Sequence, residues 1–245
     1  MRRFRVYTER TNLRVGSSVK LPDFEAEHLR KSLRVKKGDE IFIFNGEKEF
    51  RAHLTLVSKD AVMAEIDGVL ENEFDQAQKI HLIQALNKSK SFEFTLEKAT
   101  EIGVDSILPI ETEYSVVKAS DITPKKIDRW DKIILSACKQ SERITIPKIF
   151  PAINIADLDF SSYDLILFLS TEEKSNAKEI NNFVNEIQNA RNIAVIVGPE
   201  GGFSKSEVDL MLKNKNVVPV SINKNILRSE TAAIVVLGYL KIIIS

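Results

Sequence analysis

Short hydrophobic stretches, one of them with partial alternation of apolar and polar residues, dominate the first part of the chain. Residues 40–44, 49–57 and 61–66 are each predicted to form a strand, and residues 23–33 a short helix. The dipeptide Asn45-Gly46, between the first two strands, is a strong signal for a two-residue hairpin turn. Because the strands are short and closely spaced, the pattern favours a small barrel or sandwich.

Beyond about residue 80, continuous apolar runs alternate with segments of helical period. Such runs are typical of strands that are buried on both faces of a sheet. The predicted strands are residues 80–86, 106–110, 165–169, 193–197 and 217–222. This alternation predicts an α/β domain with a mainly parallel sheet. Residues 71–79 are polar and are predicted to form a linker between a β domain at 1–70 and the α/β domain at 80–245.

The predicted helices of the α/β domain begin and end at recognisable residues. The helix over residues 89–102 is followed by Gly103, which suits a C-terminal cap. Ser204 and Glu207 have the spacing of a capping box, directly after a glycine-rich segment. Ser229 is predicted to be the N-cap of a last, mostly apolar helix.

The composition is that of a globular protein and excludes several classes. Of 245 residues, 43% are hydrophobic and 29% are charged, and no apolar run is long enough to span a membrane. The single cysteine, Cys138, excludes an internal disulfide framework, and three scattered histidines give no metal-ligand cluster. We therefore expect no metal, no membrane association and no secretory signal, and we expect a reducing, cytoplasmic location.

Charge is distributed unevenly, although the chain as a whole is neutral, with 35 basic and 35 acidic residues. The first 40 residues contain 11 Lys or Arg and 6 Asp or Glu, which is a net charge of +5. A basic surface of this kind indicates a polyanionic partner such as nucleic acid. A solvated basic face without any partner is the alternative interpretation.

The segment Gly198-Pro199-Glu200-Gly201-Gly202 stands between a predicted buried strand and the capped helix. Ligands of open α/β sheets bind at such positions, outside the carboxyl ends of the strands. The segment lacks the G-x-G-x-x-G spacing and the lysine of a phosphate-binding loop, which disfavours dinucleotides and nucleoside triphosphates. We interpret it as a binding loop for another ligand, with a ligand-free turn as the alternative.

Two charged residues flank the start of the last helix. Glu230 suits the positive end of the helix dipole, so it needs no functional explanation. Arg228 is mildly unfavourable at the same place, which favours contact with a ligand, a substrate or an ion-pair partner. Cys138 lies on the apolar stripe of its helix, and no pairing of Ser, Cys and His indicates covalent catalysis.

Five motifs occur along the chain in a specific order. They are His28-Leu29 with Leu33-Arg34, residues 97–104, Gln140-Ser141 with Arg143 and Pro147, residues 198–204 with Glu207, and Ile226-Leu227-Arg228 with Glu230-Thr231-Ala232. Together they resemble the small-subunit ribosomal RNA uridine-N3 methyltransferases, a family of the knotted SPOUT superfamily, over nearly the whole chain. The chain departs from the family at residues 222–225, which read Ile-Asn-Lys-Asn in place of Leu-Gly-Pro-Arg. Because Asn tolerates positive φ, we expect the path of this loop to survive.

The resemblance implies a PUA-like β-barrel at the N-terminus, an α/β domain that contains a trefoil knot, and a homodimer. It also implies S-adenosyl-L-methionine as the cofactor, and methyl transfer to N3 of a uridine. The partner would be 16S ribosomal RNA or the small ribosomal subunit. The cofactor-binding residues carried over by position are Leu169, Ser170, Gly198, Pro199, Glu200, Gly201, Gly202, Ile222, Asn223, Ile226 and Leu227.

For the chemistry, Arg228 or Arg143 is predicted to stabilise the uracil anion, and Glu230 is the candidate base. The basic N-terminal domain is predicted to hold the RNA backbone, and the residues assigned to this contact are Arg3, Arg5, His28, Arg30 and Arg34. Two alternatives stay open: a related enzyme that acts on transfer RNA or on a ribose hydroxyl, and a non-catalytic RNA-binding scaffold. The departure at residues 223–225 is the feature that favours the scaffold.

Overall fold

The computed structural model describes residues 3–70, 77–169 and 177–244 of the chain. It consists of two compact units: Met1–Asp75 with Cys138–Ile146, and Gln76–Ala137 with Pro147–Ser245. The division near residue 75 falls within the stretch 71–79 for which the sequence predicts a linker, and of this stretch residues 71–76 lie outside the described part. The return of Cys138–Ile146 to the first unit is not expected from the sequence, because it depends on contacts with residues far away along the chain.

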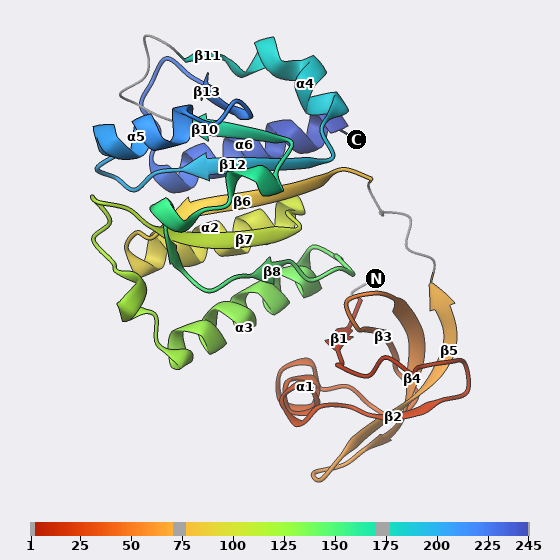
Figure 1. Cartoon of the computed structure of the whole chain (residues 1–245). Coiled ribbons are helices and arrows are strands. Elements are labelled where there is room, and N and C mark those ends of the chain that lie inside the picture. The colour runs from red at the N-terminus through yellow and green to blue at the C-terminus, as the bar shows by residue number, and fades with distance from the viewer. Residues whose placement is uncertain (1–2, 71–76, 170–176, 245) are drawn as a thin grey trace. The chain divides into compact units, whose positions relative to one another are not determined.

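The described part of the first unit is built on a strongly curved five-stranded sheet (Figure 1). Its strands are β1 (Arg5–Tyr7), β2 (Ser18–Lys20), β3 (Glu40–Phe44), β4 (Glu49–Val57) and β5 (Val62–Leu70), in the order β1-β3-β4-β5-β2. β3, β4 and β5 form antiparallel pairs, which confirms the three strands predicted there. The predicted helix is α1 (Asp23–His28), which continues as a π-helical turn, Leu29–Leu33.

The hairpin between β3 and β4 differs from the prediction in its loop. Residues 45–48 lie between the two strands, and the Asn45 N–H donates to Lys48 O at 3.2 Å, so the two residues at the tip are Gly46 and Glu47 and not Asn45 and Gly46. The side-chain oxygen of Asn45 accepts from the N–H groups of Glu47 and Lys48, at 3.0 and 2.9 Å. This placement of the turn is favoured because a single side chain satisfies two backbone donors.

Arg5 lies in the interior of the first unit. It is 7% exposed, and its Nε donates to Glu49 Oε1 at 2.6 Å. Its Nη1 and Nη2 donate to the backbone carbonyl oxygens of Cys138 and Arg143, at 2.6 and 3.2 Å. The guanidinium thus closes the C-terminal end of α3 (Pro124–Gln140), where a cation suits the helix dipole. The prediction that Arg5 binds RNA is wrong, because its charge is buried and its donors are occupied within the protein.

Within its described residues, the second unit contains an eight-stranded parallel sheet with helices on both faces (Figure 1). The strands are β6 (Lys79–Ala85), β7 (Ser106–Glu111), β8 (Lys148–Ile149), β9 (Ile153–Asn154), β10 (Leu165–Leu169), β11 (Lys178–Glu179), β12 (Asn192–Val197) and β13 (Val217–Ser221). Their order is β11-β13-β10-β12-β6-β7-β8, and β9 pairs with β7. The α/β class and its five longer strands are confirmed. The short strands β8, β9 and β11 were not predicted, because two residues carry no readable period.

The core of the second unit explains the continuous apolar runs. Ile193 and Val195 of β12 pack with residues of α2 (Ser89–Ile102), α4 (Val184–Asn189) and α6 (Ser229–Ile244). Ala194 and Ile196 of the same strand pack with residues of α5 (Lys205–Leu212). Because successive side chains of a strand point to opposite faces, a sheet covered on both sides needs apolar residues at every position. None of the helices in the described ranges has the length and apolar character that a membrane crossing requires.

Two of the three predicted helix ends are confirmed. Gly103 takes the left-handed conformation after α2, and its N–H donates to Ala99 O and Thr100 O. Ser204 and Glu207 form the capping box of α5. Ser229, in contrast, is not the N-cap of α6, because the Ala232 N–H donates to Arg228 O at 2.8 Å and makes Arg228 the first residue to accept within the helix. The trefoil knot that the resemblance implies stays a prediction.

Replacing Arg5 with Ala should lower the free energy of unfolding by about 3–5 kcal/mol, because Glu49 would remain buried without its partner. The matched control is Arg10→Ala in the same unit, where the side chain is exposed and the change should stay within about 0.5 kcal/mol. Urea denaturation followed by circular dichroism measures both values. Equal stability of the two variants would contradict the structural role of Arg5.

Candidate functional site

A pocket of about 410 Å³ opens at the carboxyl ends of β10, β12 and β13, which are neighbours in the sheet. It is lined by Leu169 at the end of β10, by residues of the segment 197–203 after β12, and by residues of the segment 220–232 that leads from β13 into α6. Its volume lies in the usual range of small-molecule sites, roughly 300–1,000 Å³. The three segments are those from which the sequence predicts the site, at the edge where ligands of parallel sheets bind.

Most of the predicted cofactor-binding residues line this pocket. They are Leu169, Gly198, Pro199, Glu200, Gly202, Ile222, Asn223, Ile226 and Leu227. Gly201 is not one of the lining residues. A Cβ at this position would point toward Tyr114. Ser170 lies outside the described residues. The structure therefore brings the predicted segments together, and their role in binding remains a prediction.

Some lining residues were not predicted. They are Val197, Phe203, Val220, Ser221, Asn225, Ser229 and Ala232, most of which adjoin a predicted residue in the same segment. Gln84, which contacts Ser229, is a different case, because it belongs to β6 and to none of the motifs. The signal that could have found it is a polar residue inside the apolar stretch 82–86, where it is completely buried.

One hydroxyl group connects the segments around the pocket. Ser229 Oγ donates to Gly198 O at 2.6 Å and accepts from Gln84 Nε2 at 2.9 Å. Ser229 and Gln84 are both buried, so water competes little for these hydrogen bonds. The glycine loop, the start of α6 and strand β6 are thereby held together. Loss of the hydroxyl would remove the acceptor from one bond of Gln84 Nε2, which also donates to Ala85 O, and the donor from Gly198 O.

The segment that departs from the family pattern forms a defined turn. Asn223 Oδ1 accepts from the Asn225 N–H at 3.3 Å, and Ser221 Oγ donates to Asn223 O at 3.5 Å. Among the described non-glycine residues, positive φ occurs at Arg34 and Glu142. Neither Asn223 nor Asn225 uses the positive φ that asparagine tolerates. The side chain of Asn223 shapes the turn instead, and Asn223 and Asn225 both line the pocket. That the loop keeps the path of the family stays a prediction.

The lining of the pocket is largely apolar and carries two charges. Of its described residues, Glu200 and Arg228 are the charged ones. A single arginine and no lysine make the pocket unsuited to a polyphosphate. The His, Cys, Asp and Glu side chains in the described ranges form no group of three that could hold a metal ion. The pocket suits a small molecule with an apolar ring and separated charges of both signs.

The three predicted catalytic residues are placed differently. Arg228 lines the pocket and is exposed. Glu230 lies in the first turn of α6 and is not a lining residue, which agrees with a role at the helix dipole. Arg143 belongs to the first unit, where its Nε donates to Thr145 Oγ1 at 3.1 Å.

Burial raises the pKa of the Cys138 thiol to about 11, so this group stays protonated at neutral pH and cannot act as a nucleophile.

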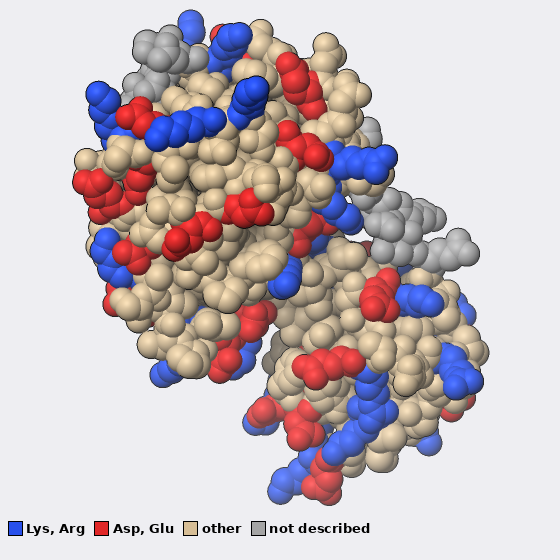
Figure 2. All heavy atoms as spheres, viewed as in Figure 1, with Lys and Arg blue, Asp and Glu red and all other residues tan. Residues whose placement is uncertain are grey.

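The remaining predicted RNA-binding residues lie in the first unit. Arg3 Nη1 pairs with Glu142 Oε2 at 2.7 Å, and Arg30 Nη1 donates to two backbone carbonyl oxygens in the turn between β4 and β5. Arg3, His28 and Arg34 are exposed. On the face of this unit that Figure 2 shows, Lys and Arg are interspersed with Asp and Glu, and no continuous basic patch is seen. This face therefore carries cations and anions side by side.

Two family models match this chain. Residues 75–241 match the RNA methyltransferase domain, and residues 21–67 match the RNA methyltransferase PUA domain. The curved sheet of the first unit and the parallel sheet of the second thus define the class: a PUA-like domain and an RNA methyltransferase domain of the α/β type in one chain.

Relatives and solved structures match nearly the whole length. A Rickettsia conorii protein named ribosomal RNA small subunit methyltransferase E is 30% identical over 98% of this chain and 95% of its own. A Mesomycoplasma hyopneumoniae protein of the same name is 35% identical over 84% of this chain and 87% of its own. A Neisseria gonorrhoeae protein of that name, in a crystal structure with bound S-adenosyl methionine, has a TM-score of 0.87 at 30% identity and covers 98% of both chains. The chain belongs to the ribosomal RNA small subunit methyltransferase E family.

Replacing Gly198 with Ala should destabilise the protein, because the added methyl group would collide with a side chain that lines the pocket. A Cβ at this position would lie 2.8 Å from Phe203 Cε2, and the ring of Phe203 is buried against Phe168. Because the ring would have to leave its packed position, we expect a loss of about 1–3 kcal/mol in the free energy of unfolding, measured in urea. Gly68→Ala is the matched control, since no atom lies within 4 Å of a Cβ there. A loss no larger than that of Gly68→Ala would show that the contact with Phe203 is not tight.

Proposed function

We propose that this protein transfers a methyl group from S-adenosyl-L-methionine to N3 of a uridine in the 16S ribosomal RNA of the small ribosomal subunit. The observation that carries the proposal is the pocket at the carboxyl ends of β10, β12 and β13, lined by the three segments assigned to the cofactor. The Neisseria gonorrhoeae relative with bound S-adenosyl methionine supports the choice of cofactor. The relatives named for the small ribosomal subunit support the choice of substrate.

The chemistry of the lining residues fits this cofactor. Leu169, Phe203 and Ile222 offer apolar walls for an adenine ring. The cofactor has an ammonium, a carboxylate and a sulfonium group, and Glu200 and Arg228 offer charges complementary to them. When bound, the sulfonium group supplies an activated methyl group. The residues of the chain are proposed to hold the cofactor and the uridine in line and to stabilise the negative charge of the uracil.

Uracil N3 carries a proton that must leave before the nitrogen can attack. Its pKa lies roughly two units above neutral, so forming the anion costs about 3 kcal/mol at pH 7. Arg228 is proposed to stabilise this anion, in preference to Arg143, because Arg228 lines the pocket. Positioning of two reactants supplies roughly 7–11 kcal/mol, which exceeds the cost. The proton passes from N3 to solvent water before N3 attacks the methyl group, so the reaction needs no strong base from the protein. Glu230, which does not line the pocket, has no necessary part in it.

The position of N3 sets a condition on the RNA. N3 lies on the Watson–Crick edge of uracil, so the target base must be unpaired or displaced when it is methylated. The PUA-like first unit is proposed to hold the RNA backbone, with Arg3, His28 and Arg34 as exposed contacts. Binding through phosphates should weaken as the salt concentration rises. The proposal places the protein in the cytoplasm, with ribosomal RNA.

A homodimer is part of the proposal because of the surface of α6. Val235 and Ile242 lie seven residues apart on this helix, hence on one side of it, and are 44% and 79% exposed. Large apolar side chains exposed together indicate a surface that another molecule covers. A second copy could cover this side with its own α6 in a two-fold symmetrical interface. Sedimentation should show a dimer for the wild type. It should show a monomer for Ile242→Glu, because that variant places a charge in the proposed interface.

The reaction is tested by incubating the purified protein with S-adenosyl-L-methionine and small-subunit ribosomal RNA, followed by mass spectrometry of the nucleosides. We expect 3-methyluridine. A methylated ribose, or methylation of transfer RNA instead, would indicate a related enzyme and contradict the proposal. Cofactor binding without any methylated product would indicate a non-catalytic scaffold. Asn223 and Asn225, of the segment that departs from the family, line the pocket.

Arg228→Ala should lower kcat for methyl transfer by about 100-fold or more, the usual effect of removing one donor to a developing negative charge. The matched control is Lys224→Ala, which removes an exposed neighbouring cation that does not line the pocket. Radiolabelled methyl transfer measures kcat, and titration calorimetry checks that the cofactor still binds. Normal turnover of Arg228→Ala with bound cofactor would remove Arg228 from the mechanism.

A further inference from the structure

The turn that follows β7 presents an aromatic ring beside the glycine loop of the pocket. Tyr114 is 46% exposed, although Thr112 and Ser115 of the same turn are buried. A Cβ on Gly201 would lie 3.0 Å from Tyr114 Cβ, so the turn and the glycine loop approach each other as closely as their backbones allow. Glu200 and Gly202, on either side of Gly201, line the pocket. Tyr114 therefore lies next to the pocket rim.

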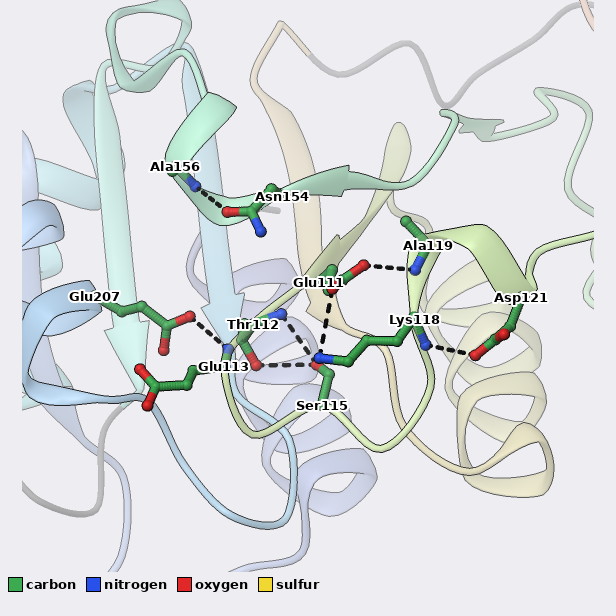
Figure 3. A network of polar contacts seen from close by, with 10 residues as sticks. All are labelled: Glu111, Thr112, Glu113, Ser115, Lys118, Ala119, Asp121, Asn154, Ala156 and Glu207. Atoms are coloured by element: carbon green, nitrogen blue, oxygen red, sulfur yellow. Dashed lines mark hydrogen bonds and ion pairs between the residues drawn. The ribbon is translucent and has the colours of Figure 1, made fainter.

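Hydrogen bonds fix the backbone of this turn (Figure 3). The Ser115 N–H donates to Thr112 O, and Ser115 Oγ accepts from the Thr112 N–H, both at 3.1 Å. Further along, Glu111 Oε2 accepts from the Ala119 N–H at 2.7 Å. The ring of Tyr114 is thus carried by an ordered turn. A molecule that stacks on it would order little additional protein, which favours binding.

Glu207 connects this turn with the loop of the pocket. Its Oε1 accepts from the Glu113 N–H at 2.8 Å, a contact that Figure 3 shows. Its Oε2 accepts from the Ser204 N–H at 2.8 Å, in the capping box of α5. Because α5 begins directly after the glycine loop, one carboxylate sets the positions of both segments. The hydrogen bonds of Glu207 therefore hold the turn that carries Tyr114 at a constant distance from the glycine loop.

The residues of the turn favour contact with a base over contact with a phosphate. Residues 112–117 contain no Lys or Arg, and Glu113 is exposed and negative. Tyr114, together with Val116 at 69% exposure, offers an apolar surface instead. Every nucleobase has a flat face that stacks on an aromatic ring, whatever its sequence context. An unpaired base that approaches the pocket thus finds a matching surface here.

We propose that Tyr114 is a substrate-binding residue on which a base of the RNA target site stacks while the uridine is presented to the pocket. This inference rests on the proposed function of the pocket. It assigns base recognition to the second unit itself, in addition to the backbone contacts proposed for the first. The ring of Tyr114 performs this role, and its hydroxyl group is not required.

The test compares Tyr114→Leu and Tyr114→Phe in the full-length protein, with small-subunit RNA and S-adenosyl-L-methionine. Tyr114→Leu should raise KM for the RNA roughly 5- to 100-fold, which is what one base–aromatic stack contributes to affinity. The Kd for the cofactor should not change. Tyr114→Phe keeps the ring and should retain the wild-type KM. Phe150→Leu, which removes another partly exposed ring of the same unit, is the matched control and should behave as wild type.

Unchanged KM in Tyr114→Leu, with an active wild-type protein, would overturn this inference and leave the proposed function intact. An equal loss in Tyr114→Phe, or an equal loss in Phe150→Leu, would also overturn it, because a stack on this ring would not explain either result. If the wild type transfers no methyl group, the proposed function fails instead. Fluorescence anisotropy of labelled RNA then compares the same variants without turnover, so Tyr114 is tested in either case.

Discussion

The pocket depends on the hydroxyl group of Ser229, which is buried between Gly198 O and Gln84 Nε2. These hydrogen bonds hold the loop after β12, the start of α6 and strand β6 in one arrangement. Because Ser229 and Gln84 are buried, water competes little for the bond between them, and the arrangement is well determined. The glycine loop and the start of α6, which both contribute lining residues, are thereby kept facing the same pocket. The geometry proposed for methyl transfer rests on this connection.

A second connection joins the glycine loop to the turn that follows β7. Glu207 caps α5 through Ser204 and also accepts from Glu113, so the turn that carries Tyr114 is tied to the same loop. The pocket and its rim are thus set by side chains that come from β6, α5 and α6, on a sheet whose strands are buried on both faces. Such support from regular elements suits a site in which two reactants must be held in line.

The sequence predicts features that depend on local pattern. The five longer strands of the parallel sheet were found because their apolar runs report burial on both faces, and Gly103 and Ser204 were found because caps are local signals. Arg5 was misjudged because its partners, Glu49 and the carbonyl of Cys138, lie far away along the chain. The same reason applies to Gln84, because its partner Ser229 lies far away along the chain. The predicted N-cap of α6 is off by one residue, because Arg228 O accepts the first hydrogen bond of the helix. Pocket residues were predictable as segments, since the carboxyl ends of neighbouring parallel strands meet at one edge.

The central claim is that the pocket binds S-adenosyl-L-methionine in a geometry held by Ser229. Titration calorimetry of the wild type and of Ser229→Ala with this cofactor tests it most directly. The account predicts one cofactor per wild-type chain. It also predicts a Kd at least about fivefold higher in the variant, because Gly198 O and Gln84 lose a buried partner. A wild type that releases no heat of binding, or a Ser229→Ala variant with the wild-type Kd, would contradict it.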